Sequence, residues 1–192
     1  MMLEKLTFAT GDRIWFTADT HFGHAGEARR RGYSDVDEHD RDLIRNWNEY
    51  VKKNDIVFHL GDFTNSEKAP FQQEIFAKLN GRKYLVLGNH DNQATYDLGW
   101  AAPPQHRMIV QIGKEQYVLD HYAGRTWYSS FHGSYQLFGH SHGRMPATNR
   151  SCDVGLDTWN LCPASIYQIR ALIDDTTLDL RAVQDQAPGP AM

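Results

Sequence analysis

Short apolar runs alternate with amphipathic segments along this chain, and a polar cluster follows each run. A continuous apolar run of this length is typical of a buried strand, and the polar residues after it would then lie in the loop that leaves the strand. Five runs have this character: 14–16, 56–58, 84–87, 117–119 and 135–138.

Two segments between these runs have the apolar spacing of helices. In 37–53, residues such as Leu43 and Trp47 recur with helical spacing, with acidic residues at the start and lysines at the end, as the helix dipole prefers. A second helix is predicted from Pro70 to Leu79, stopping near Gly81. The alternation of strands and helices predicts parallel pairing in the first half of the chain.

The second half of the chain shows a different pattern. Apolar segments at 108–112 and 116–119 flank Gly113-Lys114-Glu115, which predicts a hairpin, so we expect this half to be antiparallel or mixed. Further on, 151–156 is interpreted as a core strand and 163–169 as a short helix.

The composition is typical of one soluble domain. The chain has 192 residues, 41% of them hydrophobic and 23% charged, which is enough to bury a substantial core. We assign 1–184 to a single domain and expect 185–192, with two prolines and a glycine, to be a disordered tail. The sequence makes no prediction of oligomeric state.

Charge and cysteine content narrow the cellular setting. The formal net charge of −4 gives no general attraction to nucleic acid or to an anionic membrane, and we interpret Arg29-Arg30-Arg31 as a solvated basic face. Cys152 and Cys162 are too few for a disulfide framework, which favours a reducing compartment. With no signal peptide or membrane-spanning apolar segment in view, we expect a cytoplasmic protein.

The polar clusters carry the chemistry. Their carboxylate, imidazole and amide oxygen groups suit borderline-to-hard divalent ions, and no thiolate takes part. Two such ions about 3.5–4 Å apart would generate a strong nucleophile for hydrolysis at phosphorus. The clusters occur in this order: Asp19-Thr20-His21, Gly61-Asp62, Gly88-Asn89-His90-Asp91, His121 and Gly139-His140-Ser141-His142.

This ordered set resembles the calcineurin-like metallophosphoesterase superfamily, whose members carry D-x-H, GD, GNH(D/E), H and GHxH in the same order. The resemblance extends from about Arg13 to about Ile169. The amino-acid sequences of segments 19–24, 59–63 and 137–143 further resemble those of a group of small bacterial and phage-encoded members.

The resemblance implies an α/β fold, a four-layer α-β-β-α sandwich with mixed sheets and a dinuclear metal site at one edge. It implies that a hydroxide bridging the two metals attacks phosphorus and that His90 is the acid. Among Mn, Fe, Zn, Co and Ni, Mn is our preferred assignment. The implied ligands are Asp19, His21 and His142 for the first metal, Asn89, His121 and His140 for the second, and Asp62 as the bridge.

The chain departs from related protein phosphatases at two places. The carboxylate that orients the acid histidine there is replaced by Asn65, so either Asp91 compensates or no residue does. Near His121, the unusual Asp120 either hydrogen-bonds a ligand histidine or is solvated. His59 alternates with apolar strand residues, and we expect it to be a buried, hydrogen-bonded side chain rather than a ligand.

Candidate substrate contacts lie beside the ligand loops. His24, Arg125, His132 and Arg144 either contact the substrate or serve as ordinary structural or solvated residues. The segment 121–140 should form one wall of the pocket. We expect its aromatic residues to pack the loop onto the domain, the alternative being that they stack on a base or an aromatic leaving group. These residues are Trp127, Tyr128 and Phe131.

The preferred function is a metal-dependent phosphodiesterase acting on a small organic or nucleotide phosphoester. One alternative is a nuclease of the same superfamily, which the acidic net charge and the absence of sequence for an added DNA-holding domain disfavour. The other is a non-enzymatic scaffold, which would be expected to have lost ligands.

Overall fold

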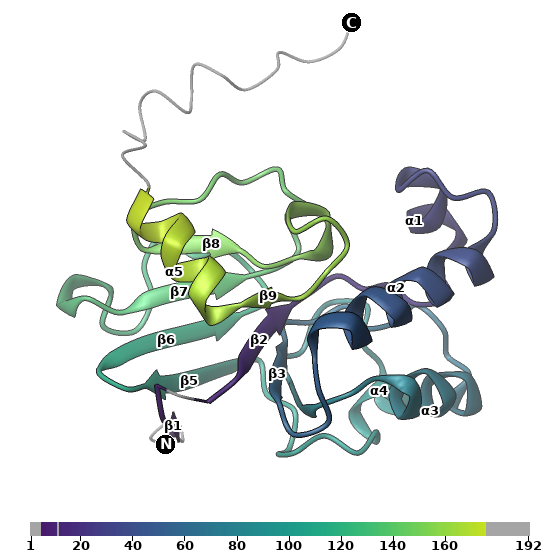
Figure 1. Cartoon of the computed structure of the whole chain (residues 1–192), viewed down its shortest axis with the longest axis horizontal. Helices are drawn as coiled ribbons and strands as arrows, with labels where there is room; N and C mark the ends of the chain where they lie inside the picture. The colour runs from purple at the N-terminus through teal and green to yellow at the C-terminus, as the bar shows by residue number, and fades with distance from the viewer. Residues whose placement is uncertain (1–4, 11, 176–192) are drawn as a thin grey trace, which may run out of the picture.

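Two β-sheets face each other in the computed structural model, which describes residues 5–10 and 12–175 (Figure 1). The first sheet has the strand order β4-β3-β2-β9, with β2, β3 and β4 parallel and β9 antiparallel to β2. Its strands are β2 (Ile14–Thr17), β3 (Ile56–His59), β4 (Arg82–Leu85) and β9 (Ala164–Ser165).

The second sheet has the order β1-β5-β6-β7-β8. Its β5–β6 pair is antiparallel and its other pairs are parallel. Both sheets are therefore mixed, and the predicted α/β fold of two mixed sheets is confirmed. The strands are β1 (Lys5–Phe8), β5 (Arg107–Ile112), β6 (Glu115–Asp120), β7 (Tyr135–Phe138) and β8 (Ser151–Asp153).

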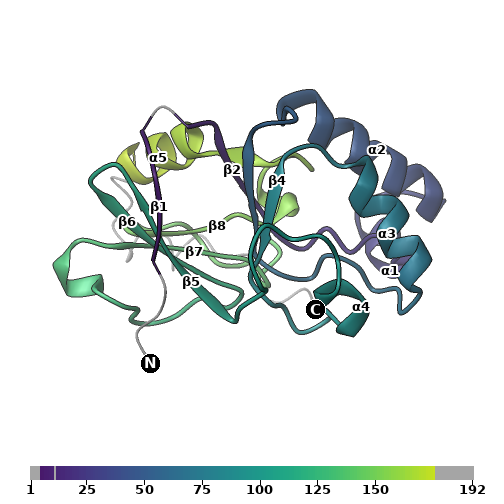
Figure 2. The ribbon, with the colours of Figure 1, turned by 90° about the horizontal axis from the view of Figure 1, so that it is seen from below.

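The main hydrophobic core lies between the two sheets. Figure 2 shows the two sheets from below. Alternation along each strand directs Phe16 and Phe58 of the first sheet toward Tyr117 and Leu137 of the second, and all four are fully buried. Burying each such side chain contributes roughly 1.5–3 kcal/mol, so this layer accounts for much of the stability of the fold.

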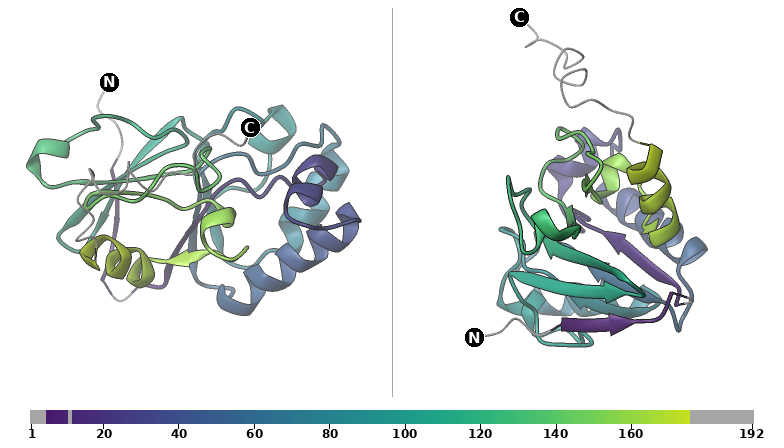
Figure 3. Two further views of the ribbon diagram at one scale, coloured as in Figure 1. Left: turned by 90° about the horizontal axis from the view of Figure 1, so that it is seen from above. Right: turned by 90° about the vertical axis from the view of Figure 1, so that its left-hand side faces the viewer.

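Helices cover the outer face of the first sheet (Figure 3). Trp47 of α2 (Val36–Tyr50) and Ile75 of α3 (Ala69–Lys78) join a second core with Trp15 and Val57 of the sheet. The remaining helices are α1 (Ala25–Arg30), α4 (Gln93–Tyr96), α5 (Ile166–Asp175) and the 3₁₀ turns η1 (Ser130–His132) and η2 (Leu156–Thr158).

The helix α5 does not pack on the outer face of the first sheet. Its residues Ile166, Ile169 and Ile173 belong to the core between the sheets, beside β9, β2 and β8. The predicted short helix over 163–169 is therefore longer and begins later, because Ala164 and Ser165 first pair with β2.

The predicted hairpin and the predicted start of α3 are confirmed, whereas the predicted end of α2 is wrong. The hairpin is β5–β6, and α3 begins with Pro70 in its first turn. The lysines predicted at the end of α2 lie beyond it: Val51 turns to extended backbone, and α2 has no basic residue in its last turn. The tail 185–192 lies outside the described residues, and the assignment of 1–184 to one domain stays a prediction.

The topology gathers the polar clusters at one edge. The carboxyl ends of the parallel strands β2, β3 and β4 meet at the same edge of their sheet, as those of β6 and β7 do in the other. A bridge between Ala18 and Gly155 and a hydrogen bond from Leu156 N to Ala18 O join the two edges. Segments far apart in sequence therefore converge here.

Candidate metal centre

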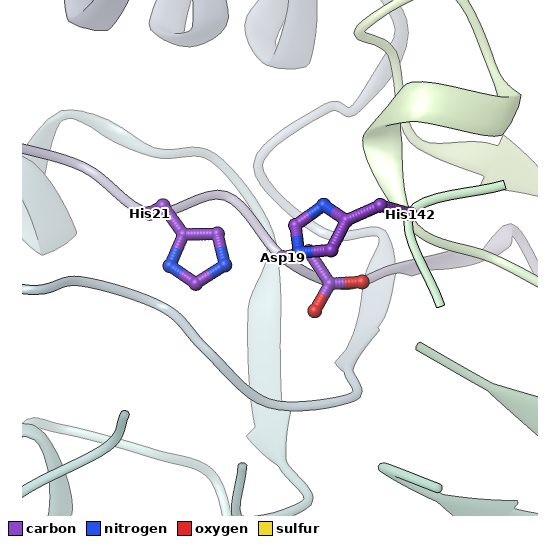
Figure 4. A group of neighbouring side chains, drawn as sticks. All are labelled: Asp19, His21 and His142. Atoms are coloured by element: carbon purple, nitrogen blue, oxygen red, sulfur yellow. The ribbon is translucent and has the colours of Figure 1, made fainter. Parts of the chain in front are cut away.

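Three of the predicted ligands form a first group. Asp19 and His21 follow β2, His142 follows β7, and each offers an atom that lies within 4.8 Å of the others (Figure 4). The rings of His21 and His142 are nearly parallel, with centroids 5.4 Å apart. Asp19 also accepts hydrogen bonds from the backbone N–H of His140 at 2.9 and 3.1 Å, which ties the β2 loop to the β7 loop.

A second group consists of Asp62, His121 and His140, again with ligand atoms within 4.8 Å of one another. The Nε2 atom of His121 also lies 3.0 Å from the amide oxygen of Asn89. Because Nδ1 of His121 donates to a backbone carbonyl, that Nε2 is an acceptor, and a shared cation would stabilise two acceptors at this distance.

Asp62 lies between the two groups. Its Oδ2 atom is 3.6 Å from Nε2 of His21 and 3.5 Å from Nε2 of His121. Its Oδ1 atom accepts a hydrogen bond of 2.9 Å from the backbone N–H of His90. One oxygen is thus held by the protein while the other faces a histidine from each group.

Two glycines leave room for the predicted ligands Asp62 and His121. A Cβ atom added to Gly88 would lie 2.2 Å from Oδ1 of Asp62, and one added to Gly61 would lie 2.5 Å from Nδ1 of His121. Gly61 also has a φ of 94°, in the left-handed region. Both positions therefore need glycine for close approach.

Five of the seven predicted ligands have left-handed backbone. Among the described residues, eight that are not glycine have positive φ, and five of the eight are in this set. Such conformations cost of order 1–3 kcal/mol each and persist where the surrounding structure holds them, typically at functional sites. The five residues are Asp19 (56°), His21 (49°), Asp62 (59°), His140 (64°) and His142 (49°).

Burial shapes the electrostatics of the first group. It raises the pKa of Asp19 to about 8 and lowers the pKa of His21 to about 2, with neighbouring charges as smaller causes. Both ring nitrogens of His21 are buried without a hydrogen-bond partner. A divalent cation fits these groups, since it stabilises the carboxylate and binds neutral imidazole.

His90 is close to the centre and exposed. Its ring centroid is 5.3 Å from that of His21. Among the described residues, no hydrogen bond joins the side chain of the exposed Asn65 to His90, and the Asp91 carboxylate does not bond to the His90 ring either. Instead, Asp91 accepts hydrogen bonds from the backbone N–H groups of Gly88, Asp62 and Phe63. Asp91 thus holds two ligand loops together.

Neither interpretation of Asp120 is correct, and the interpretation of His59 is confirmed. Asp120 is buried and forms an ion pair with Arg107, without a hydrogen bond to a ligand histidine. His59 is fully buried, and its Nε2 lies 3.0 Å from the hydroxyl of Thr20.

The candidate substrate residues lie in different settings. His24 caps α1 by accepting a hydrogen bond from Glu27 N, although its ring centroid is 5.8 Å from that of His21. Arg144 is exposed, with Nε donating to Ser141 O. His132 is exposed in η1, and Arg125 lines a cleft.

That cleft, of about 360 Å³, lies between the loop that follows His121 and the loop that follows His142. Its walls include Phe131, Phe138 and Arg150. Trp127 is partly buried and its Nε1 donates to Ser134 of the same segment, so its packing onto the domain stays a prediction. For Tyr128 and Phe131 the packing prediction is wrong, because they are 56% and 87% exposed.

The sequence analysis missed four residues near the centre. The Tyr122 hydroxyl donates to Oδ1 of Asn89 at 3.1 Å, and its ring centroid is 4.5 Å from that of His140. Asp157 is 2.7 Å from Nδ1 of His142. Arg30 and Arg31 both bind Asp157, so the basic run is not a uniformly solvated face. No motif marks these residues, because their roles depend on contacts between distant segments.

A third cluster of possible ligands, Glu27, His142 and Asp157, shares His142 with the first group. Arg30 pairs with both carboxylates at 2.6 and 2.7 Å, and Arg31 pairs with Asp157 at 3.0 Å. These guanidinium groups already neutralise the acidic charge, so the cluster is an ion-pair network rather than a further cation site.

Comparisons with known proteins find related sequences and a similar fold. The chain is 32% identical over 196 residues to the gene 66 protein of Mycobacterium phage D29, covering 84% of this chain and 96% of that protein. It is 30% identical over 172 residues to an uncharacterised protein of Methanocaldococcus jannaschii, covering 84% and 92%. A protein of unknown function from Aquifex aeolicus has a similar fold, with a TM-score of 0.62 at 20% identity, covering 86% of this chain and all of that one.

Among the described residues, none of the helices has the length and apolar character needed to cross a membrane.

The sequence model of the calcineurin-like phosphoesterase domain matches residues 12–123, which include the loops after β2, β3 and β4 and His121 after β6. This match, together with the two relatives at 30% identity or above, shows that the chain belongs to the calcineurin-like phosphoesterase family.

Proposed function

We propose that this protein is a dinuclear metal-dependent phosphodiesterase that hydrolyses a small organic or nucleotide phosphoester. The observation that carries the proposal is the position of Asp62, whose Oδ2 atom lies 3.6 Å from His21 and 3.5 Å from His121. A carboxylate between two histidine-containing groups is suited to bridge two cations, because its charge offsets their repulsion.

The first ion would be held by Asp19, His21 and His142, and the second by Asn89, His121 and His140. We prefer Mn among Mn, Fe, Zn, Co and Ni, since carboxylate, imidazole and amide ligands suit these ions. When bound, such ions activate water and offset charge on the phosphoryl oxygens. Asn89 contributes a neutral oxygen, which adds no further negative charge to the centre.

His90 is proposed as the acid. Its backbone N–H is fixed by Asp62, and its exposed ring lies beside His21. It can therefore reach the leaving-group oxygen of a substrate bound at the centre and give it a proton. His24 and Arg144 are proposed to contact phosphoryl oxygens from the rim, since both belong to the loops that carry ligands.

The organic part of the substrate is proposed to occupy the cleft between the loop that follows His121 and the loop that follows His142. The cleft combines aromatic side chains, Phe131 and Phe138, with the cationic side chains of Arg125 and Arg150, and His132 lies nearby in η1. Its volume of about 360 Å³ is in the usual range for small-molecule sites. An aromatic ring with a negative charge nearby, such as a nucleotide, fits this lining.

Cytoplasm remains our proposed location. Cys152 is buried, Cys162 is partly exposed, and neither forms a disulfide. Free thiols are compatible with a reducing compartment.

The test is hydrolysis of bis-p-nitrophenyl phosphate and p-nitrophenyl phosphate by chelated protein resupplied with Mn, Co, Ni, Zn or Mg. Asp62→Asn should abolish turnover and weaken binding of both ions, because it removes the bridging charge. Asp37→Asn is the matched control, since Asp37 is exposed at the start of α2.

Cleavage restored by metal in the wild type and in Asp37→Asn, but not in Asp62→Asn, is the expected result. Faster cleavage of the diester than of the monoester supports a phosphodiesterase, and the reverse order would replace it with a phosphomonoesterase. A wild-type protein that binds no stoichiometric metal would overturn the proposal and favour a scaffold.

A further inference from the structure

The Arg31 guanidinium is buried beside the first ligand group, with only 2% of its side chain exposed. Its neighbours in the run differ: Arg29 is exposed, and 43% of the Arg30 side chain is exposed at the rim. Three consecutive arginines thus occupy three environments, and only Arg31 is enclosed.

Each of the five N–H donors of Arg31 has an acceptor. Nε donates to Oδ1 of Asp157 at 3.0 Å, and Nη2 donates to Oδ2 of Asp157 at 3.1 Å and to Asp19 O at 2.6 Å. Nη1 donates to Thr20 O at 3.1 Å and to Nε2 of His39 at 3.1 Å. A guanidinium can satisfy a site with this number of acceptors, whereas an ammonium has three donors.

Two of these acceptors belong to the ligand turn itself. The carbonyls of Asp19 and Thr20 lie in the turn that presents Asp19 and His21, both of which have left-handed backbone. Hydrogen bonds from one rigid group to successive carbonyls restrain this unfavourable conformation.

Asp157 connects Arg31 to the third member of the group. Nδ1 of His142 lies 2.7 Å from Oδ2 of Asp157 and 2.9 Å from Nη2 of Arg30. The shorter contact is to a carboxylate, which only accepts, and it favours a proton on Nδ1 that leaves Nε2 to face Asp19 (Figure 4). A carboxylate behind a histidine ligand fixes the tautomer and orientation of its ring.

Arg31 is anchored in turn by α2. His39, fully buried, accepts from Arg31 and donates Nδ1–H to Asp40 at 2.9 Å, and Asp40 also accepts from Gly23 N. A continuous set of hydrogen bonds therefore runs from α2 through Arg31 and Asp157 to His142.

We propose that Arg31 is a positioning residue for the first metal group. It holds the Asp19–His21 turn directly and orients His142 through Asp157. The inference rests on the proposed function to the extent that this group binds a metal ion. It also assigns the basic run a part in building the site rather than in binding nucleic acid.

The test compares Arg31→Lys with Arg29→Lys in the full chain. Mn²⁺ binding is measured by equilibrium dialysis, and electron paramagnetic resonance with two equivalents of Mn²⁺ distinguishes a coupled ion pair from single ions. Arg31→Lys should weaken one of the two sites about 10- to 100-fold and give the spectrum of isolated ions. Arg29→Lys should bind Mn²⁺ like the wild type, since it makes the same arginine-to-lysine replacement at an exposed side chain.

Asp157→Asn provides a second variant in case Arg31→Lys does not fold, which circular dichroism of the chelated proteins would reveal. It should lose the same single site. Two ions bound by both Arg31→Lys and Asp157→Asn with wild-type affinity would overturn the inference while leaving the proposed function intact. A wild type that binds no Mn²⁺ would overturn both.

Discussion

The backbone carbonyl of Leu60 accepts a hydrogen bond of 2.7 Å from Nδ1 of His121. A carbonyl cannot donate, so this contact fixes the proton of His121 on Nδ1 and leaves Nε2 facing Asp62 and Asn89. Leu60 precedes Gly61-Asp62, so the chain segment that presents the proposed bridging carboxylate also sets the tautomer of His121, a proposed ligand from the other sheet.

Replacing His90 separates acid catalysis from metal binding. His90→Ala should lower turnover about 10²- to 10⁴-fold, because general acid catalysis contributes that much, while two ions remain bound. The loss should be smaller for diesters with a p-nitrophenolate leaving group than for those with an alkoxide, which needs the proton more. Steady-state kinetics over a series of leaving groups, with metal analysis, checks this.

His106→Ala is the control for this experiment, since His106 is exposed and lies outside the centre. An equal loss for every leaving group would argue against an acid role for His90. A variant without bound metal would instead make His90 a ligand.

The close approach at Gly88 predicts a sharp steric effect. Gly88→Ala places a methyl group 2.2 Å from Oδ1 of Asp62, so the loop or the carboxylate must move. We expect a loss of about 1–3 kcal/mol in the free energy of unfolding and weakened metal binding. Urea denaturation and dialysis with Mn²⁺ measure the two effects.

Gly99→Ala is the matched substitution, because the nearest contact of its methyl group would be an ordinary 3.6 Å to Phe76. It should bind metal like the wild type. Two variants with the same metal affinity would show that the space beside Asp62 is not required.

The cleft predicts a selective effect on substrate binding. Phe131→Ala should raise KM roughly 2- to 10-fold for diesters with an aromatic group, corresponding to the loss of one ring contact, and leave methyl diesters unaffected. Stability should hardly change, because Phe131 is 87% exposed.

Tyr167→Ala, which removes a ring that is 58% exposed on α5, is the comparison. The measurement is the KM of each variant for paired aromatic and methyl diesters, from Michaelis–Menten kinetics. A uniform change for both substrates in Phe131→Ala would place the organic group elsewhere.

Lys83 predicts a pH dependence of stability. Burial lowers the pKa of Lys83 from its ordinary value of 10.5 to about 8, although its ammonium donates to Leu79 O and Gly81 O. The unfolded chain therefore binds more protons between about pH 8 and 10.5, so this residue makes stability rise with pH across that window, by up to about 3 kcal/mol.

Lys83→Met keeps the length of the side chain and removes the titration. The difference in unfolding free energy between wild type and Lys83→Met, from urea denaturation at pH 7.5, 9 and 10.5, should shift in favour of the wild type as pH rises. A difference that is constant with pH would show that Lys83 titrates alike in the folded and unfolded chain.

The sequence by itself predicted the strands that precede each polar cluster, the hairpin β5–β6 and the identity of the clustered residues. Local patterns suffice here, because side-chain periodicity reports burial and because Asp19, Asp62 and His121 lie within four residues of the end of an apolar run.

Only the tertiary structure decided how distant residues share contacts. Arg31 resembled its two neighbours in sequence, yet packing against α2 and Asp157 enclosed it alone. Asp120 paired with Arg107 because β5 and β6 place them opposite each other. The left-handed backbone of Asp19 and Asp62 is likewise invisible locally, because such conformations are unfavourable for these residues and are imposed by contacts between loops from different strands.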